Sequence, residues 1–200
     1  MKILPIKRIT DESALNNFWE YSMIQPLQAS ACFGFTSNEV KVLCQKSNMD
    51  FDELAAWYDG YQIGEEPSVF NPNSVMKATN VKKCSSFWAA TGAYDKVAKY
   101  INLNYDGLRD DVINMLGGGR CSVDTTSFVN NMSVVRSKDD VFTVLIHLGY
   151  LAYDSEKKKC YIPNREIYQE WMDENGQWHY GYEDGKMQPS GVGLRIGIEW

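Results

Sequence analysis

Apolar residues recur at helical spacing close to residue 40. Val40, Leu43 and Cys44 fall on one face of a helix. They follow Thr36 and Glu39, which have the spacing of a capping box, in which each side chain can bond the backbone amide of the other residue. The pattern predicts a helix that begins directly after Thr36.

A second apolar stripe is formed by Phe51, Leu54 and Trp57. It follows Asp50, and the Asp59-Gly60 pair is typical of a turn that ends a helix. We therefore expect a second short helix between these two points.

The next segment combines an extended piece with a helix start. Val69-Phe70 is predicted to be extended, Asn71 is a candidate N-cap, and Pro72 suits the first helical position because proline needs no amide partner there. A helix is expected to follow. Further along, residues 85–90 are expected to be extended or buried, and additional helices are expected from Thr91-Gly92 and over 106–116, the latter ended by a triple glycine.

The clearest pattern is near the C-terminal end. Ser137 precedes an apolar stripe over 138–148, and Gly149 can end that helix. Residues 150–153 and 160–162 are predicted to be two strands joined by a charged turn, and Pro163-Asn164 to lead into a helix over 165–172. The order helix, hairpin, helix is typical of a winged-helix-like unit.

These patterns predict a mainly α chain with a minor α+β character. We expect an N-terminal segment over 1–35, a helical lid-like bundle over 36–120 and a winged-helix-like unit over 121–172. The remaining residues, 173–200, are rich in glycine and aromatic residues and are expected to form a β-rich tail in which Asp184-Gly185 turns a hairpin.

The composition limits the functions that fit. Hydrophobic residues make up 44% and aromatic residues 13%, enough for a packed core. The formal net charge of −6 disfavours nucleic-acid binding over the whole surface, although a local basic patch is compatible with it. No apolar run has the length of a membrane span and the start does not resemble a signal peptide, so we expect no membrane partner and a cytoplasmic location.

Cysteine and histidine give no metal site. The five cysteines are Cys32, Cys44, Cys84, Cys121 and Cys160, with no C-x-x-C pair, and buried free thiols are favoured over disulfides. His147 and His179, the only histidines, have no cysteine or histidine at metal-ligand spacing. His147 is expected to be a core or boundary residue rather than a catalytic base.

The search for catalytic motifs gives no catalytic residue. No G-x-x-x-x-G-K-[ST] stretch is present, and the glycines of 117–119 lack phosphate-loop spacing, so a helix end is favoured there. No G-x-S-x-G and no strand pair with nuclease-type acidic residues is found. The carboxylate pairs near predicted helix starts are attributed to capping and to the helix dipole.

A local basic turn is the one feature that favours nucleic acid. Lys157, Lys158 and Lys159 lie in the predicted wing, where basic residues of DNA-binding winged helices contact phosphates. A solvated hairpin tip is the alternative and is favoured by the acidic net charge.

Six short segments, taken in order, resemble one family. They are FGFTSNEV (33–40), WYDGYQIG (57–64), FNPNSV (70–75), FWAATG (87–92), LGYLAY (148–153) and YIPNREI (161–167). In sequence and spacing they are similar to the AAA-ATPase-like proteins of anaerobic bacteria, which often carry a C-terminal restriction-endonuclease-like nuclease domain. The resemblance covers roughly residues 10–170, and it departs from the family pattern at Asn73, where an aromatic residue is usual.

The resemblance implies a P-loop ATPase core, with ATP and Mg²⁺, before the matching region, and a nuclease after it. Neither set of catalytic residues has a position here onto which it can be carried, so no cofactor is expected in this chain. The motif residues that the resemblance singles out, as structural or ligand-adjacent, are Trp57, Tyr58, Asp59, Gly60, Tyr61, Asn71, Pro72, Trp88, Thr91, Gly149, Tyr150, Pro163 and Asn164.

Three functions remain open. The first is a non-catalytic lid and winged-helix-like part of an AAA-ATPase-like protein, with an ATPase core or another protein as partner. The second is a nucleic-acid-binding module that uses helix 138–148 and the wing lysines. The third is a nuclease-associated remnant. A packed aromatic corner is favoured over a direct ligand role for Asp59 or Asn71.

Overall fold

The computed structural model describes residues 21–88, 105–126, 128 and 135–172, together with two short strands of the tail. The first part of the chain contains η1 (Leu27–Cys32), β1 (Phe35–Thr36), α1 (Ser37–Ser47), α2 (Phe51–Tyr58), β2 (Tyr61–Ile63), β3 (Glu66–Phe70) and α3 (Pro72–Val81). The second part contains η3 (Tyr105–Gly107), α5 (Leu108–Leu116), β4 (Cys121–Ser122), α6 (Lys138–Leu148), β5 (Ala152–Asp154), β6 (Lys159–Tyr161) and α7 (Arg165–Trp171), and the tail contains β7 (Tyr182–Glu183) and β8 (Lys186–Met187).

Local sequence signals set the helix starts as expected. Thr36 and Glu39 form the complete capping box of α1. Asn71 caps α3 and Pro72 is its first residue, and Ser137 caps α6 by accepting from the amide of Asp140. These predictions are confirmed because each depends on contacts within a few residues of the helix end.

In the first part, three helices pack on a small antiparallel sheet of order β1-β3-β2. Phe35 pairs with Phe70 and Tyr61 with Val69. Helices α1, α2 and α3 enclose an apolar cluster whose buried members are Val40, Cys44, Leu54, Tyr58, Phe70, Val75, Ala78 and Cys84.

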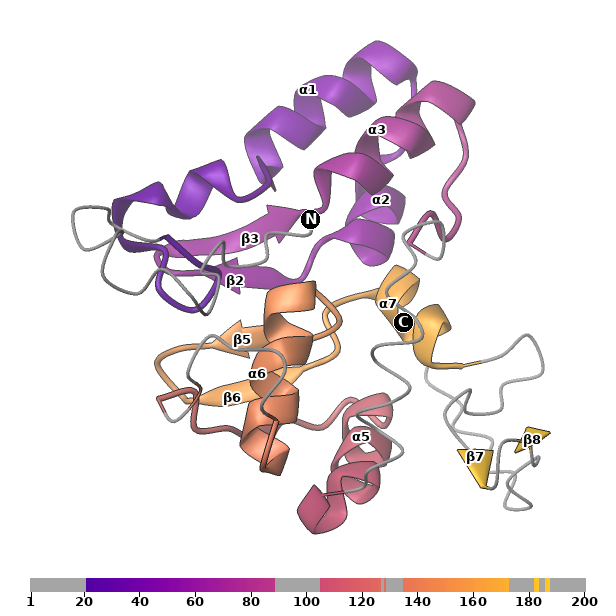
Figure 1. Cartoon of the computed structure of the whole chain (residues 1–200). Helices are drawn as coiled ribbons and strands as arrows, with labels where there is room; N and C mark the ends of the chain where they lie inside the picture. Colours follow the sequence, from indigo (N-terminus) through magenta and orange to yellow (C-terminus); the bar gives the residue numbers. More distant parts are fainter. Residues whose placement is uncertain are drawn as a thin grey trace, which may run out of the picture.

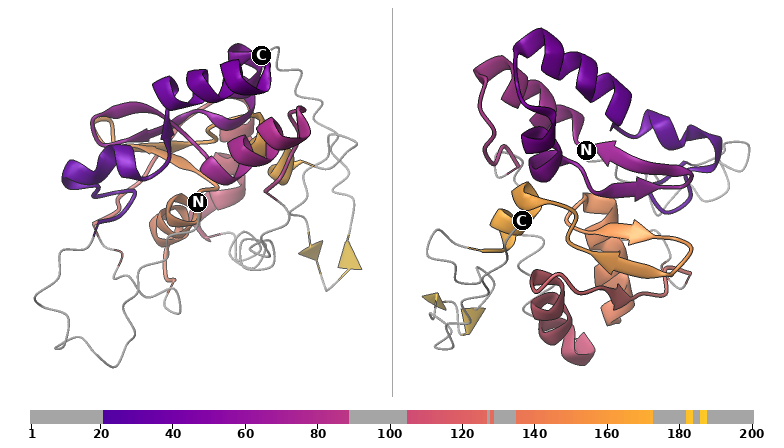
Figure 2. Two further views of the ribbon diagram at one scale, coloured as in Figure 1. Left: turned by 90° about the horizontal axis from the view of Figure 1, so that it is seen from above. Right: turned by 180° about the vertical axis from the view of Figure 1, so that it is seen from behind.

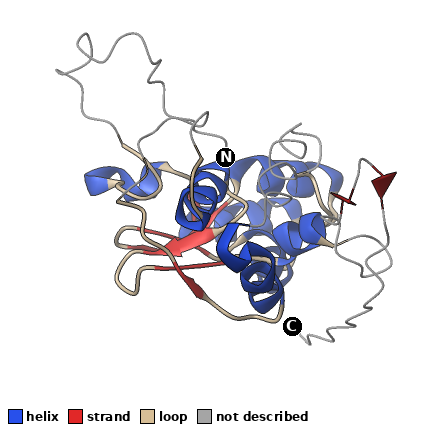
Figure 3. Ribbon diagram, turned by 60° about the horizontal axis from the view of Figure 1, so that its bottom comes forward, coloured by secondary structure: helices blue, strands red, loops and turns tan. Residues whose placement is uncertain are grey.

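In the second part, α5 and α6 pack against a sheet of order β4-β6-β5. Strand β6 is central and is antiparallel to both neighbours. Figure 3 shows the strands of the two sheets close together, with helices around them.

One of the two buried clusters spans both parts of the molecule. Strand β2 lies against β5, and α2 lies against α7 (Figures 1 and 2). Phe33, Tyr61, Ile63 and Val69 of the first part belong to the same buried cluster as the residues of α5, α6 and the second sheet. The two parts of the molecule are therefore joined by packed side chains.

The architecture is α+β, which corrects the prediction of a mainly α chain. The region 36–120 is not a purely helical bundle, because it contains most of a three-stranded sheet. Strands β1, β2 and β4 were not predicted. They are only two or three residues long, too short to show the alternation of apolar and polar positions that identifies a strand.

Some predictions lie outside the described residues. Thr91 and the helix expected after it belong to this group, as do the N-terminal twenty residues and most of the tail. Strands β7 and β8 pair Tyr182 with Met187, which confirms the predicted hairpin of the tail. In the described part of the chain, no helix is long and apolar enough to cross a membrane.

Candidate functional site

Five of the six motif segments contribute residues to the region where the two parts of the molecule join. We call this region the motif junction: it comprises residues 57–61 at the α2–β2 corner, 71–74 at the start of α3, 85–88, 149–150 after α6, and 161–166 at the β6–α7 corner. The motif residues that the resemblance singles out all lie in it, apart from Thr91, which is outside the described residues. The resemblance therefore singles out residues that are close together in space.

Two sharp corners interlock at the centre of the junction. The side-chain amide of Asn164 donates to the carbonyl of Asp59 at 2.6 Å, and the hydroxyl of Tyr161 donates to the carbonyl of Gly60 at 3.0 Å. Gly60 has φ +97°, and an added Cβ would lie 2.0 Å from the carbonyl oxygen of Pro163. Only glycine permits this approach of the two backbones.

Asn164 also caps a helix at this corner. Its side-chain oxygen accepts from the amide of Ile167 at 3.0 Å and caps α7. One buried side chain thus starts a helix and holds the neighbouring corner, since its oxygen and its nitrogen face different elements.

A buried carboxylate connects the starts of α3 and α7. Glu166 is fully buried, and its oxygens accept from the hydroxyl of Ser74 at 2.8 and 2.9 Å and from the amide of Phe87 at 2.8 Å. The side-chain amide of Asn71 lies 3.4 Å away and also donates to Ser74. Burial raises the pKa of Glu166, while these donors oppose the rise.

Two tyrosine hydroxyls form hydrogen bonds with backbone groups of the motif junction. The Tyr58 hydroxyl donates to the carbonyl of Ser85 at 2.9 Å and accepts from its amide at 3.0 Å. The Tyr61 hydroxyl donates to the carbonyl of Gly149 at 2.7 Å. Burial raises the pKa of both tyrosines, so these hydroxyls are protonated donors at neutral pH.

Aromatic rings fill the space between these bonds. Tyr150 meets Trp88 and Trp171 edge to face, with ring centroids 5.6 and 6.3 Å apart. The guanidinium of Arg165 lies over the ring of Trp57 at 5.6 Å. Of the predicted corner residues, Trp57 and Tyr58 have ring centroids 6.1 Å apart.

We expect Tyr61→Phe to lower the free energy of unfolding by about 1.5 kcal/mol, because it leaves the buried carbonyl of Gly149 without a donor. Urea denaturation measures the change. Tyr161→Phe is the matched control: its hydroxyl bond is longer and its side chain is only partly buried, so we expect a smaller loss. An equal or larger loss in the control would contradict the importance of the Tyr61 bond.

Two buried polar atoms at the junction have no hydrogen-bond partner among the described residues: Oδ1 of Asp59 and Nε1 of Trp88. Trp88 lines an apolar pocket together with Tyr61, Asn71 and Gly149. The pocket has room for about one water molecule. It is too small for a nucleotide.

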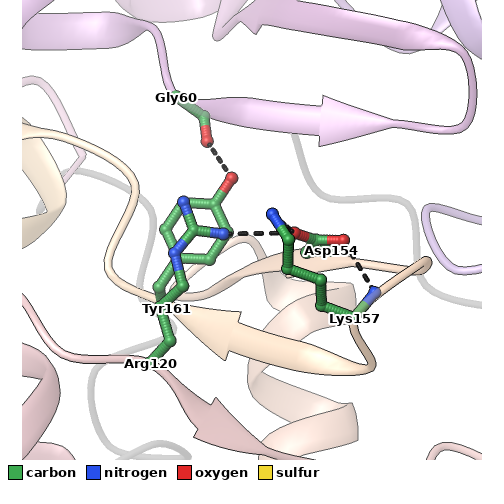
Figure 4. A network of polar contacts seen from close by, with 5 residues as sticks. All are labelled: Gly60, Arg120, Asp154, Lys157 and Tyr161. Carbon is green, nitrogen blue, oxygen red and sulfur yellow. Dashed lines mark hydrogen bonds and ion pairs between the residues drawn. The ribbon is translucent and has the colours of Figure 1, made fainter.

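The wing lysines are not motif residues, and Lys157 has a local ion-pair partner. Figure 4 shows Asp154 between Arg120 and Lys157, each with a nitrogen 3.3 Å from its carboxylate. The pKa of Asp154 is lowered mainly by the hydrogen bond from the Lys157 amide. The side chain and charge of Lys157 and the charge of Arg120 lower it further. The guanidinium of Arg120 also stacks over the Tyr161 ring at 4.0 Å.

The other two wing lysines are held by the sheet. The carbonyl of Lys158 accepts from the amide of Val123 at 3.1 Å, and its charge lies near Asp124. Lys159 is a half-buried residue of β6. The basic turn is therefore part of a mixed-charge hairpin.

Helix α6 is enclosed on all sides. Its residues from Asp140 to Leu148 are all buried. His147 is 6% exposed, and burial lowers its pKa to about 4, so the ring is neutral at pH 7. It packs against Phe128 with ring centroids 6.1 Å apart, which confirms the prediction of a core histidine.

The carboxylate pairs have structural partners. Asp50 accepts from the amide of Glu53 at the start of α2, and Asp140 accepts from the amide of Arg136 at 2.9 Å. Asp111 forms an ion pair with Lys138 at 2.7 Å. Among the residues that the structure describes, no group of three or more His, Cys, Asp or Glu is placed to hold a metal ion.

Sequence reasoning missed Glu166 and Ser74. Both are polar residues in the first turn of a helix, where such residues ordinarily face solvent and complement the helix dipole. Their signal is that both lie inside motif segments, Ser74 in FNPNSV and Glu166 in YIPNREI, although the resemblance did not single them out.

Comparisons of the chain with protein-family models, with curated proteins and with solved structures find no match.

Proposed function

We propose that this chain is the non-catalytic lid and winged-helix-like part of an AAA-ATPase-like protein and that it acts through contacts with a P-loop ATPase core. The observation that carries the proposal is the motif junction. The side chains of the motif residues bond one another across the two parts of the molecule. They build a scaffold, and the ATP and Mg²⁺ chemistry belongs to the core.

The topology of the second part supports the winged-helix-like assignment. Helix α6 is followed by the hairpin β5–β6, and β4 adds to the far side of β6, giving the order β4-β6-β5. A helix followed by a hairpin, with an earlier strand completing the sheet, is the arrangement of a winged-helix-like unit. Here the helix before the hairpin is buried, and we assign it a packing role.

The geometry does not favour the nucleic-acid alternative. A helix that reads a groove needs an exposed face, and the buried residues of α6 leave none from Asp140 onward. Lys157 is already paired with Asp154. No observation on the described residues supports a nuclease-associated role.

We expect the triple change Lys157→Ala, Lys158→Ala and Lys159→Ala to leave duplex DNA binding unchanged. The reason is that Lys157 is paired with Asp154, Lys158 lies near Asp124 and Lys159 is half-buried in β6. Fluorescence anisotropy with a labelled duplex at several salt concentrations measures the effect. A salt-dependent affinity of the wild-type chain that the triple variant loses would support the nucleic-acid alternative instead.

Co-purification tests the proposal. The tagged chain is mixed with a separately expressed P-loop ATPase core of an AAA-ATPase-like protein from the same genome. We expect the two to elute together in size-exclusion chromatography at micromolar concentration, and an unrelated P-loop ATPase of similar size to elute apart. Separate elution of the family core would contradict the proposed contact.

A further inference from the structure

Two cysteines face each other across neighbouring strands of the second sheet. Cys121 of β4 is the direct partner of Cys160 of β6. The next pair of the same hydrogen-bonding type is Val123 and Lys158, where the amide of Val123 donates to the carbonyl of Lys158 at 3.1 Å. Cys121 and Cys160 therefore occupy a hydrogen-bonded position of the antiparallel ladder.

Both thiols lie on the face of the sheet that α5 covers. The Cys121 thiol donates to the carbonyl of Asp111 at 3.3 Å and accepts from the side-chain amide of Asn114 at 3.6 Å. The Cys160 sulfur lies 3.9 Å from the sulfur of Met115. Because residues 111, 114 and 115 share one face of α5, the two cysteines point into the same space.

The spacing of this pair suits a disulfide. Directly opposed residues at a hydrogen-bonded position have Cα atoms about 5.5 Å apart. Disulfides are commonest at Cα separations of about 5.5–6 Å. Opposed Cβ atoms lie about 4.5–5.5 Å apart, with the larger values at hydrogen-bonded positions, and a disulfide needs about 3.5–4.5 Å, so the cross-link requires side-chain rotation and also a small approach of the two backbones.

The other cysteines lack such an arrangement. Cys44 is on α1, Cys84 follows α3, and Cys32 is exposed at the end of η1. None of these three belongs to a strand of the described sheets.

We propose that Cys121 and Cys160 form a reversible cross-strand disulfide when the protein meets a peroxide. The Cys121 thiolate attacks one peroxide oxygen, the O–O bond breaks, and a sulfenic acid and one water form. The Cys160 sulfur then attacks the Cys121 sulfur, the S–O bond breaks, and a second water leaves. The two thiols are oxidised by two electrons, and the peroxide is reduced to two waters.

Access determines the order of these steps. Cys121 is on the outer strand β4 and is 6% exposed, whereas Cys160 is on the central strand and fully buried. Burial raises the pKa of both thiols, so the resting pair is the dithiol. Reaction follows local opening of β4, which is only two residues long.

Disulfide formation changes how α5 is held. The bond replaces the hydrogen of Cys121 that is donated to Asp111 and moves its sulfur away from Asn114. Both residues are on α5, so the oxidised protein loses contacts between this helix and the sheet. Oxidation of the cysteine pair by peroxide therefore weakens the packing of α5 against the sheet.

Peptide mapping of the native wild-type chain tests the inference. The chain is treated with hydrogen peroxide, unreacted thiols are alkylated after unfolding, and tryptic peptides are identified by mass spectrometry. We expect peptide 121–136 to be joined to peptide 160–165, and treatment with a dithiol reductant to separate them. The exposed Cys32 is the internal reference for peroxide dose.

Three results would overturn the inference. They are a fully oxidised Cys32 with both buried thiols unmodified, linkage of Cys121 or Cys160 to another cysteine, and accumulation of an unlinked oxidised Cys121 in the wild-type chain. Cys160→Ala provides a second measurement: it should leave Cys121 as a sulfenic acid that dimedone traps. If that variant does not fold, the wild-type map decides.

Discussion

Replacing Gly60 with alanine is expected to lower the free energy of unfolding by about 3 kcal/mol. The residue has φ +97°, and the new Cβ would lie 2.0 Å from the carbonyl oxygen of Pro163. That oxygen belongs to backbone, so relief requires the two corners to separate. Their separation removes the 2.6 Å bond from Asn164 to Asp59.

Gly118→Ala is the matched control for this change. Gly118 also has a positive φ, +82°, but an added Cβ there meets no atom within 4 Å. We expect it to lose about 1 kcal/mol, the cost of the left-handed conformation alone. Urea denaturation of both variants measures the difference. Equal losses would mean that the close contact between the corners does not stabilise the protein.

The second large effect is expected at Glu166. Glu166→Ala should lower the free energy of unfolding by about 2 kcal/mol, because it leaves the Phe87 amide and the Ser74 hydroxyl without their acceptor and creates a cavity. Glu166→Gln is the control. Its oxygen can accept from Phe87 and its amide can donate to Ser74, so we expect a smaller change. A larger loss for Gln than for Ala at pH 5 would contradict this assignment of the bonds.

The pH dependence of the same site has a defined sign. Burial raises the folded pKa of Glu166 above its ordinary value of 4.5. Between the unfolded and the folded pKa the folded protein holds more protons, so the stability contributed by the protonated carboxyl is fully present below pH 4.5 and is lost as the pH rises through the folded pKa. We therefore expect the stability of the wild type minus that of Glu166→Gln to fall as the pH rises from about 4 to 7.

Denaturation series at several pH values measure this difference, in which most other titrating groups cancel. A difference that rises over the same range would contradict the raised pKa. A constant difference would mean that Glu166 keeps an ordinary pKa in the folded protein.

Local features of the fold could be predicted from the sequence, and distant pairings could not. The caps at Thr36, Asn71 and Ser137 were predictable because each side chain bonds an amide two or three residues away. Strand β4 was not, because its two residues become a strand only through pairing with β6, nearly forty residues later. Short strands depend on distant partners, which periodicity along the chain does not show.

In the candidate site, too, local features could be predicted from the sequence and contacts between distant residues could not. Asp59, Gly60 and Asn164 were singled out because they belong to segments that resemble one family. Their mutual contact depends on a pairing between residues 105 apart, as in the bond from Asn164 to Asp59. Glu166 escaped notice because its burial arises from the packing of α7 against α2 and α3, and not from its neighbours in the chain.

The motif junction also explains why residues of such different chemistry occur together in the motif segments. Gly60 permits a backbone contact, Asn164 caps a helix and bonds a carbonyl, and Tyr61 bonds Gly149. A substitution at any of these three residues would disturb the contact between the two parts of the molecule rather than a contact with a ligand. Residues of this kind hold the two parts of the molecule together.

The central claim is that these motif residues support contact with an ATPase core and do not bind nucleotide themselves. Calorimetric titration of ATP with Mg²⁺ into this chain alone tests it most directly. We predict no saturable heat up to millimolar ATP. Saturable binding with a stoichiometry near one, weakened by Glu166→Gln, would contradict the account and would make the motif junction a nucleotide site.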